Sequence, residues 1–302
     1  MTKPQNLTFK ERVDRASGIL YVLPSFSILC LIAVVPIIYT AYLSFTTYDV
    51  FSAPVPNGVE NYRQLLHDEN FRLALLNTVI FTALTVPFQT IIPMILADQL
   101  VRSDHPKLSG FVRSTLFIPV VASLILVGMV WQYMLAANGG TFNEMLHFFH
   151  LISDDYNINF LGTRTGALFA VAFVSIWKHI GYFLVIFYAG VQDIPRERYE
   201  AARVDGANRV QQFIHITMPG LRPITFLVVI LGTIWSFQVF DLVYSMTGGG
   251  PAGGTTTIVI SIFEEGFKNM QMGYASAISM FLFVCVVGIS VAQQLIYKRI
   301  EK

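Results

Sequence analysis

Charged side chains are scarce in this sequence. They make up 13% of the 302 residues, whereas hydrophobic residues make up 54%. A soluble globular domain usually carries charges at about a quarter of its positions. The chain therefore has too little polar surface to cover a water-exposed fold, and lipid is its natural solvent.

An excess of charge of either sign is also lacking. The formal net charge is +1. Binding to nucleic acid requires a basic face that neutralises phosphates. Nucleic acid is therefore not expected as a partner.

Cysteine is nearly absent, and the two that occur, Cys30 and Cys285, lie in apolar runs. They indicate small buried side chains, not a disulfide framework. The sequence has no metal-ligand spacing, no nucleophile arrangement and no phosphate-binding Gly-x-x-x-x-Gly-Lys-Ser/Thr motif. We therefore expect no catalytic residue, no metal ligand and no cofactor on this chain.

Long hydrophobic runs are what the sequence does have. A membrane-spanning helix needs about 20 apolar residues. The first run is too long for a signal peptide and no small-residue cleavage site follows it, so we expect it to be retained. The pattern predicts an all-α polytopic membrane protein with six transmembrane helices, at about 18–45, 73–97, 114–136, 166–191, 224–246 and 274–297.

The positions of lysine and arginine predict the orientation. Of the 20 such residues, 15 lie in the N-terminus, the second loop, the fourth loop and the C-terminus, and four lie in the alternate loops. Positive residues accumulate on the cytoplasmic side. The pattern predicts a cytoplasmic N-terminus at 1–17, a membrane domain at 18–297 with a cytoplasmic loop at 192–222, and a cytoplasmic C-terminus at 298–302.

The loop at 192–222 has the features of two short helices. Asp193 is a favourable N-cap, and Pro195 suits the first helical turn. Gly206 can end the first helix in the left-handed conformation. A second helix is expected at about 208–217.

The loop also resembles a known motif. Glu200-Ala201-Ala202, Gly206, Ile216 and Pro219 keep every spacing of the EAA loop found in permeases of ABC importers, and Met218 replaces the usual leucine. The resemblance to the carbohydrate branch extends to Asn77-Thr78, Ile176-Trp177-Lys178, the stretch Arg203-Val-Asp-Gly-Ala, Thr247-Gly-Gly-Gly-Pro and Gly273-Tyr-Ala-Ser-Ala. The glycine loop is similar to that of the first permease of maltose-type and glycerol-phosphate-type systems.

The resemblance implies a type I ABC importer permease fold and a sugar or sugar-like polyol as the solute. It implies a second, related permease, a dimer of ATP-binding subunits that holds the ATP and Mg, and an extracytoplasmic substrate-binding protein. It also implies a prokaryotic plasma (inner) membrane. The residues expected to transmit ATPase movement are Tyr199, Glu200, Ala201, Ala202, Asp205 and Gly206.

Polar and aromatic residues inside the predicted spans are candidates for the translocation path. A charge such as Lys178 is costly in a membrane, so it should face a cavity or a partner. Mostly apolar sites with a few polar groups are typical of small-molecule binding. The candidates are Trp177, Lys178, Trp235, Gln238 and Asp241. A structural role stays open for each: Lys178 can pair with Asp241, and Gln238 can bond another helix.

Three alternative functions remain. A permease for a non-sugar solute would share the loop. A self-sufficient secondary carrier would be expected to have several paired acids inside the membrane, and the predicted spans contain few. A membrane enzyme would need a catalytic cluster, which the sequence does not show.

Overall fold

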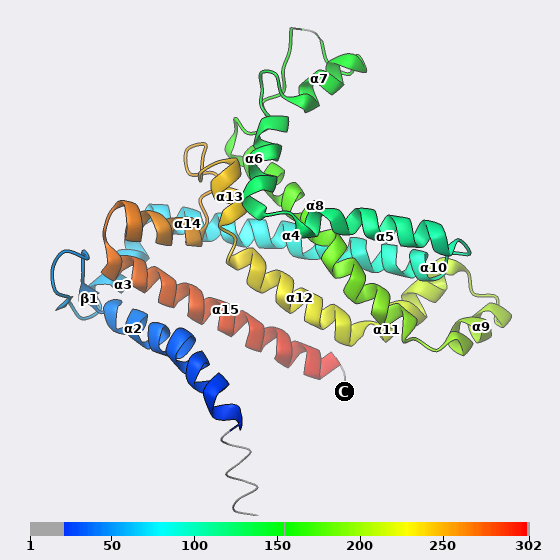
Figure 1. The fold of residues 1–302 in the computed structure, drawn as a ribbon, viewed down its shortest axis with the longest axis horizontal. Coiled ribbons are helices and arrows are strands. Elements are labelled where there is room, and N and C mark those ends of the chain that lie inside the picture. Colours follow the sequence, from blue (N-terminus) through cyan, green and yellow to red (C-terminus); the bar gives the residue numbers. More distant parts are fainter. Residues whose placement is uncertain (1–20, 154, 301–302) are drawn as a thin grey trace, which may run out of the picture.

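Helices form nearly all of the regular structure (Figure 1). The structure, a computed structural model, describes residues 21–153 and 155–300. The predicted N-terminus at 1–17, the beginning of the first predicted span and the last two residues of the predicted C-terminus lie outside these ranges. The only strands in the described ranges, β1 (Thr46–Thr47) and β2 (Val55–Pro56), pair as a short antiparallel hairpin. A predominantly helical fold is thus confirmed.

In the part of the chain that the structure describes, four helices are long and apolar enough to cross a membrane by length and composition. They are Tyr21–Leu43, which contains the π-helix η1 (Cys30–Val34) and α2 (Val35–Leu43), then α4 (Glu69–Val101), α8 (Arg164–Gln192), and Met272–Arg299 within α15 (Met272–Ile300). Two bent helix pairs bring the number to six if each pair counts as one span. The structure therefore supports four to six spans.

The predicted span at 114–136 is not one straight helix. It comprises part of α5 (Pro106–Val121) and all of α6 (Leu124–Met134), which meet at an angle of 99°. Ala122 and Ser123 have extended backbone conformations between them. Both sides of the break are apolar, so hydropathy alone does not reveal it.

The predicted span at 224–246 is also interrupted. The helix α12 (Arg222–Phe237) ends before Gln238, and the short helix α13 (Asp241–Met246) follows. At its other end, α12 is bent by 72° from the stretch Arg209–Gly220. The two interruptions bring residues near 122 and 238 to one cavity, described below.

The centre of the fold is α4, which packs chiefly against α8 and α12. The close approach of α8 to α5 depends on Gly181, because a Cβ atom there would collide with the carbonyl oxygen of Leu116. Buried side chains around this centre include Phe81, Phe183 and Phe187. These side chains form the interior of the helix bundle.

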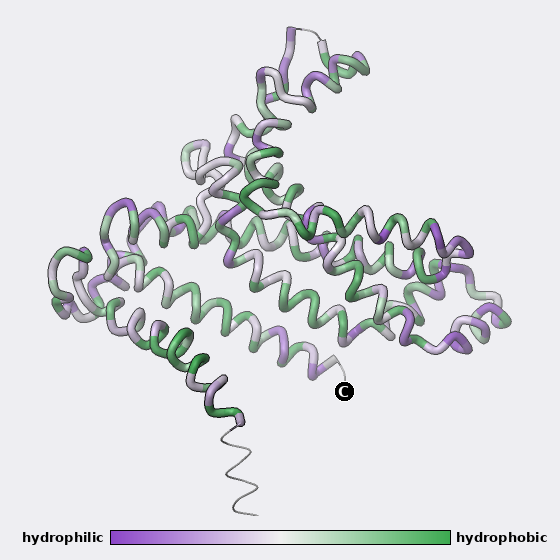
Figure 2. The backbone as a smooth tube through the Cα atoms, viewed as in Figure 1, coloured by the Kyte–Doolittle hydropathy of each residue, from purple (hydrophilic) through white to green (hydrophobic). Residues whose placement is uncertain are grey.

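Large apolar side chains also cover the outside of the helices. Leu31 and Ile32 are 69% and 70% exposed, and the green lengths of the tube in Figure 2 follow the long helices. Soluble monomers rarely expose contiguous apolar surface of this extent. The surface therefore fits contact with lipid.

The loops gather at opposite ends of the bundle. The β hairpin and α3 (Glu60–His67) lie at the left end in Figure 1, near α14 (Ile258–Phe263) and the π-helix η3 (Glu264–Lys268), whereas α9 (Arg196–Val204) lies at the right end. The arm formed by α6 and α7 (Thr141–Phe148) projects from the body. The glycine loop after α13 is held by α4, because Asn77 Nδ2 donates to the carbonyl oxygens of Gly253 and Thr256 at 2.8 and 3.0 Å.

Candidate functional site

The loop at 192–222 contains the two expected helical segments. The first, α9, begins at Arg196 because Pro195 is still extended, with ψ 130°. The expectation that Asp193 is the N-cap is wrong: Asp193 is the C-cap of α8, and Pro195 occupies the N-cap position of α9. The sequence is ambiguous here because only three residues separate the end of one helix from the start of the next.

Gly206 makes the turn between the two segments. Its φ of +80° lies in the left-handed region, as expected, and Ala207 N donates to Ala202 O at 2.8 Å. The second segment is continuous from Arg209 to Gly220 and consists of α10 (Arg209–Gln212), the π-helix η2 (Phe213–Thr217) and α11 (Met218–Gly220). It extends three residues beyond the predicted end at 217.

The first loop helix has one buried anchor and a broad exposed surface. Tyr199 is buried, whereas Glu200, Ala201, Asp205 and Gly206 are exposed and Ala202 is half-buried. Five of the six residues expected to meet an ATPase thus reach the surface, and Tyr199 faces the permease itself. Val204 adds an apolar side chain that is 88% exposed.

Tyr199 belongs to a polar network that joins the loop to α4. Its hydroxyl lies 3.0 Å from Thr217 Oγ1, which donates to Asp98 Oδ1 at 2.7 Å. Arg102 forms an ion pair with Asp98, donates to Gln212 Oε1 at 3.0 Å and lies over the Tyr199 ring at 4.4 Å. The side chains of Asp98 and Arg102 are 10% and 17% exposed. The network fixes the loop to the end of a spanning helix.

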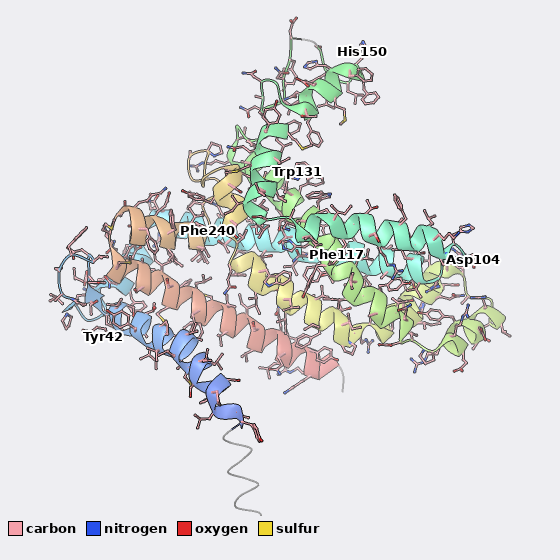
Figure 3. The ribbon with its side chains drawn as sticks, in the orientation of Figure 1. Tyr42, Asp104, Phe117, Trp131, His150 and Phe240 are labelled. Atoms are coloured by element: carbon pink, nitrogen blue, oxygen red, sulfur yellow. The ribbon has the colours of Figure 1, made fainter. Side chains whose placement is uncertain are left out.

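A cavity of about 500 Å³ lies where the broken spans meet α4 and α8. Its volume is within the range of small-molecule sites. Lys178, Trp235, Gln238 and Asp241 line it, so four of the five path candidates are brought together. Trp177 is not among the lining residues: it packs against Trp131 with ring centroids 5.4 Å apart (Trp131 is labelled in Figure 3).

The ammonium group of Lys178 is fully engaged by backbone. Its Nζ donates to the carbonyl oxygens of Pro119, Val120 and Ala122 at 2.8, 3.2 and 2.8 Å. These carbonyls are at the end of α5, where helix ends leave acceptors unsatisfied and favour a cation. Lys178 and Asp241 form no ion pair in the part of the chain that the structure describes. Lys178 therefore stabilises the break between α5 and α6 and borders the cavity.

Aromatic rings form one wall of the cavity. Trp235 lies 5.4 Å from the His179 ring and 5.1 Å from the Tyr182 ring, measured between centroids. Phe240, labelled in Figure 3, comes from the stretch between α12 and α13. Rings present apolar faces with a few polar atoms at their edges. The wall can stack against a flat apolar face of a solute.

Sequence reasoning missed Gln89 in α4. It lines the cavity, is 2% exposed, and its Nε2 has no hydrogen-bond partner among the described residues. Buried polar groups normally have partners. The sequence alone could have identified Gln89, since an amide in the middle of the second predicted span is unusual and marks a helix contact or a binding group.

Known proteins resemble this chain over most of its length. The family described as "Binding-protein-dependent transport system inner membrane component" matches residues 69–302. The trehalose/maltose transport system permease protein MalF of Thermococcus litoralis is 32% identical over 289 residues, covering 95% of each chain. The sn-glycerol-3-phosphate transport system permease protein UgpA of Agrobacterium fabrum is 32% identical over 246 residues, covering 81% of this chain and 80% of that protein.

A solved structure has the same fold. A chain of a bacterial ABC transporter involved in the import of the acidic polysaccharide alginate superposes with a TM-score of 0.83 at 23% identity, covering 96% of this chain and 99% of that chain. Because the family profile covers more than half of the sequence and the identities to the relatives exceed 30%, this chain belongs to the family of binding-protein-dependent transport system inner membrane components.

Proposed function

We propose that this permease subunit forms half of the translocation path for a sugar or a sugar-like polyol. The observation that carries the proposal is the cavity of about 500 Å³, which combines an aromatic wall with Gln89, Gln238 and Asp241. Such a lining suits a solute with hydroxyl groups and apolar ring faces. The names of the relatives, a trehalose/maltose permease and a glycerol-phosphate permease, support a carbohydrate-related solute.

We further propose that the path is completed by partners. A second permease would supply the other half, and a substrate-binding protein would deliver the solute from outside. A dimer of ATP-binding subunits would dock on the largely exposed segment 200–206 and supply the ATP hydrolysis. In this arrangement six spans cross a prokaryotic plasma membrane, and both termini are cytoplasmic, as the distribution of lysine and arginine favours.

The assembly is tested by mild extraction of the tagged chain from its native membrane, followed by mass spectrometry of what co-purifies. We expect a second permease with the same loop motif and an ATPase with a nucleotide-binding motif. Recovery of the folded chain alone, with ATP-independent uptake in vesicles, would instead indicate a self-sufficient carrier. An intact complex that carries only a non-sugar solute would support the alternative within the importer class.

Replacing Gly206 with valine is expected to uncouple ATP hydrolysis from transport. A β-branched residue at φ +80° is strained by roughly 1–3 kcal/mol, so the turn between α9 and α10 should change shape. We expect solute uptake by the reconstituted importer to fall at least tenfold while ATPase activity persists. The matched control is Gly58→Val, since Gly58 has φ +65° and open space around it but lies between β2 and α3, away from the loop at 192–222. If Gly206→Val kept the full uptake expected of Gly58→Val, the coupling role would be refuted.

A further inference from the structure

The ammonium group of Lys178 borders the cavity, but all of its hydrogen-bond donors already have partners. Among the described residues that line the cavity, Lys178 is the only lysine or arginine. An ammonium group has three donors, and three backbone carbonyls accept from it. No donor remains for an anionic group of a solute. Recognition of phosphate or carboxylate normally relies on free Arg or Lys donors.

The cavity also has a carboxylate without a basic partner. Asp241 lines it, and its side chain takes part in no ion pair within residues 21–153 and 155–300. A charged group inside a membrane protein is costly and usually faces a pathway or a partner. Next to an incoming anion, Asp241 would be repulsive. Next to hydroxyl groups, the same carboxylate is a strong acceptor.

The other polar groups of the lining suit hydroxyl groups as well. Gln89 and Gln238 each have an amide that donates and accepts. His179 Nδ1 lies 2.7 Å from the carbonyl oxygen of Ser175, so Nδ1 carries the hydrogen, and in the neutral ring Nε2 is left as an acceptor. The site thus offers mixed donors and acceptors, together with an aromatic wall and no unused cation.

From this arrangement we propose that the cavity admits neutral polyhydroxylated solutes and rejects anionic ones such as sugar phosphates and uronates. The inference rests on the proposed function, because it assumes that the cavity is part of the translocation path. It also distinguishes this chain within its family, since the names of its relatives include both a neutral disaccharide and sn-glycerol 3-phosphate. Asp241 is the residue that sets the charge selectivity.

The test needs neither a known substrate nor ATP. Single cysteines are introduced as Gln238→Cys and Ala122→Cys, two exposed lining positions, in a background with Cys30→Ser and Cys285→Ser. The purified complex is treated with a cationic, a neutral and an anionic methanethiosulfonate reagent. Each rate is divided by the rate of the same reagent with 2-mercaptoethanol, which removes differences in intrinsic reactivity.

We expect the anionic reagent to react about tenfold more slowly than the neutral one at both positions, because a nearby unit charge acts strongly in a partly desolvated cavity. Asp241→Asn should reduce this difference to about threefold or less. The matched control Asp104→Asn removes a charge from an exposed loop and should leave the difference unchanged. An anionic reagent that is as fast as the neutral one would overturn the proposal. So would a difference that is insensitive to Asp241→Asn, or no reaction at either cysteine.

Uptake by the complete importer in proteoliposomes separates this inference from the proposed function. The probes are maltose and trehalose as neutral solutes, and sn-glycerol 3-phosphate and an alginate oligosaccharide as anionic ones. ATP-dependent uptake confined to the neutral probes is expected. ATP-dependent uptake of an anionic probe would overturn the charge selectivity and leave the importer assignment intact. Uptake that does not depend on ATP would contradict the importer mechanism, while the thiol reaction would still decide the charge selectivity.

Discussion

Replacing Lys178 with methionine is expected to abolish most uptake, with at least a tenfold loss. Methionine keeps the length of the side chain but removes the donors to the carbonyl oxygens of Pro119, Val120 and Ala122. A hydrogen bond from a charged group contributes about 1.5–3 kcal/mol, and an orphaned buried acceptor costs about 1–3 kcal/mol. Relief from burying the ammonium group offsets part of this loss. The break between α5 and α6 should therefore lose its geometry.

The loss is measured as ATP-dependent uptake and as the thermal stability of the purified complex. Lys107→Met is the matched control, because Lys107 is exposed at the start of α5. Lys178→Arg should restore part of the activity, since it retains the cation but changes its shape. Small alkylammonium ions should rescue the smaller variant Lys178→Ala if the ammonium–carbonyl contact is the essential feature. Normal uptake and stability of Lys178→Met would refute the structural role.

Replacing Asp98 with alanine is expected to detach the loop at 192–222 from α4. The change leaves the largely buried Arg102 side chain, which is 17% exposed, without its anion and removes the acceptor for Thr217 Oγ1. Breaking a buried ion pair by removing one partner typically costs 3–5 kcal/mol. We expect ATPase activity to continue while uptake falls more than tenfold. Hydrogen exchange should become faster in the segment 196–220.

The double variant Asp98→Ala/Arg102→Met sharpens this test. It removes both charges, so no unpaired charge remains buried, and its stability should recover relative to Asp98→Ala alone. Uptake should stay low in the double variant, because the hydrogen bonds from Arg102 to Gln212 and Thr217 of the loop are still missing. Asp104→Ala, at an exposed position near the same end of the bundle, should behave like the unaltered protein. Equal uptake by Asp98→Ala and Asp104→Ala would contradict the anchoring role.

The regular parts of this fold were predictable because hydropathy reports burial in lipid directly. The long helices α4, α8 and α15 contain their predicted spans, and the left-handed Gly206 followed from local backbone chemistry. The break near 122 was not predictable, because both of its sides are apolar, and the polar Gln238 and Asp241 at the other break were interpreted as residues of the path. The breaks depend on tertiary contacts, such as the one between Lys178 and the end of α5.

The candidate site was likewise predictable from the sequence only in part. The sequence marked Lys178 and Asp241 as unusual inside a span, and both line the cavity. The partners of Lys178 could not be derived, because backbone carbonyls carry no sequence signal. Trp177 was chosen for its proximity in sequence to Lys178, but the helical period turns it toward Trp131. Asp98 and Arg102 were not predicted as site residues, because charged side chains are common where a predicted span meets a predicted cytoplasmic loop.

The central helix α4 is tied to separate structures at its two ends. Near its start, Asn77 donates to the glycine loop and Thr78 accepts from the backbone N–H of Ile258 at the start of α14. Near its end, Asp98 and Arg102 bond the loop at 192–222. At 1.5 Å per residue, positions 77 and 98 are about 30 Å apart. A displacement at one end must therefore reach the other or be absorbed by bending. Pro87 and Pro93, the two prolines inside α4, are where such bending would concentrate. The stiffness of α4 at these two prolines therefore sets how much of a displacement of the loop at 192–222 is transmitted to the glycine loop.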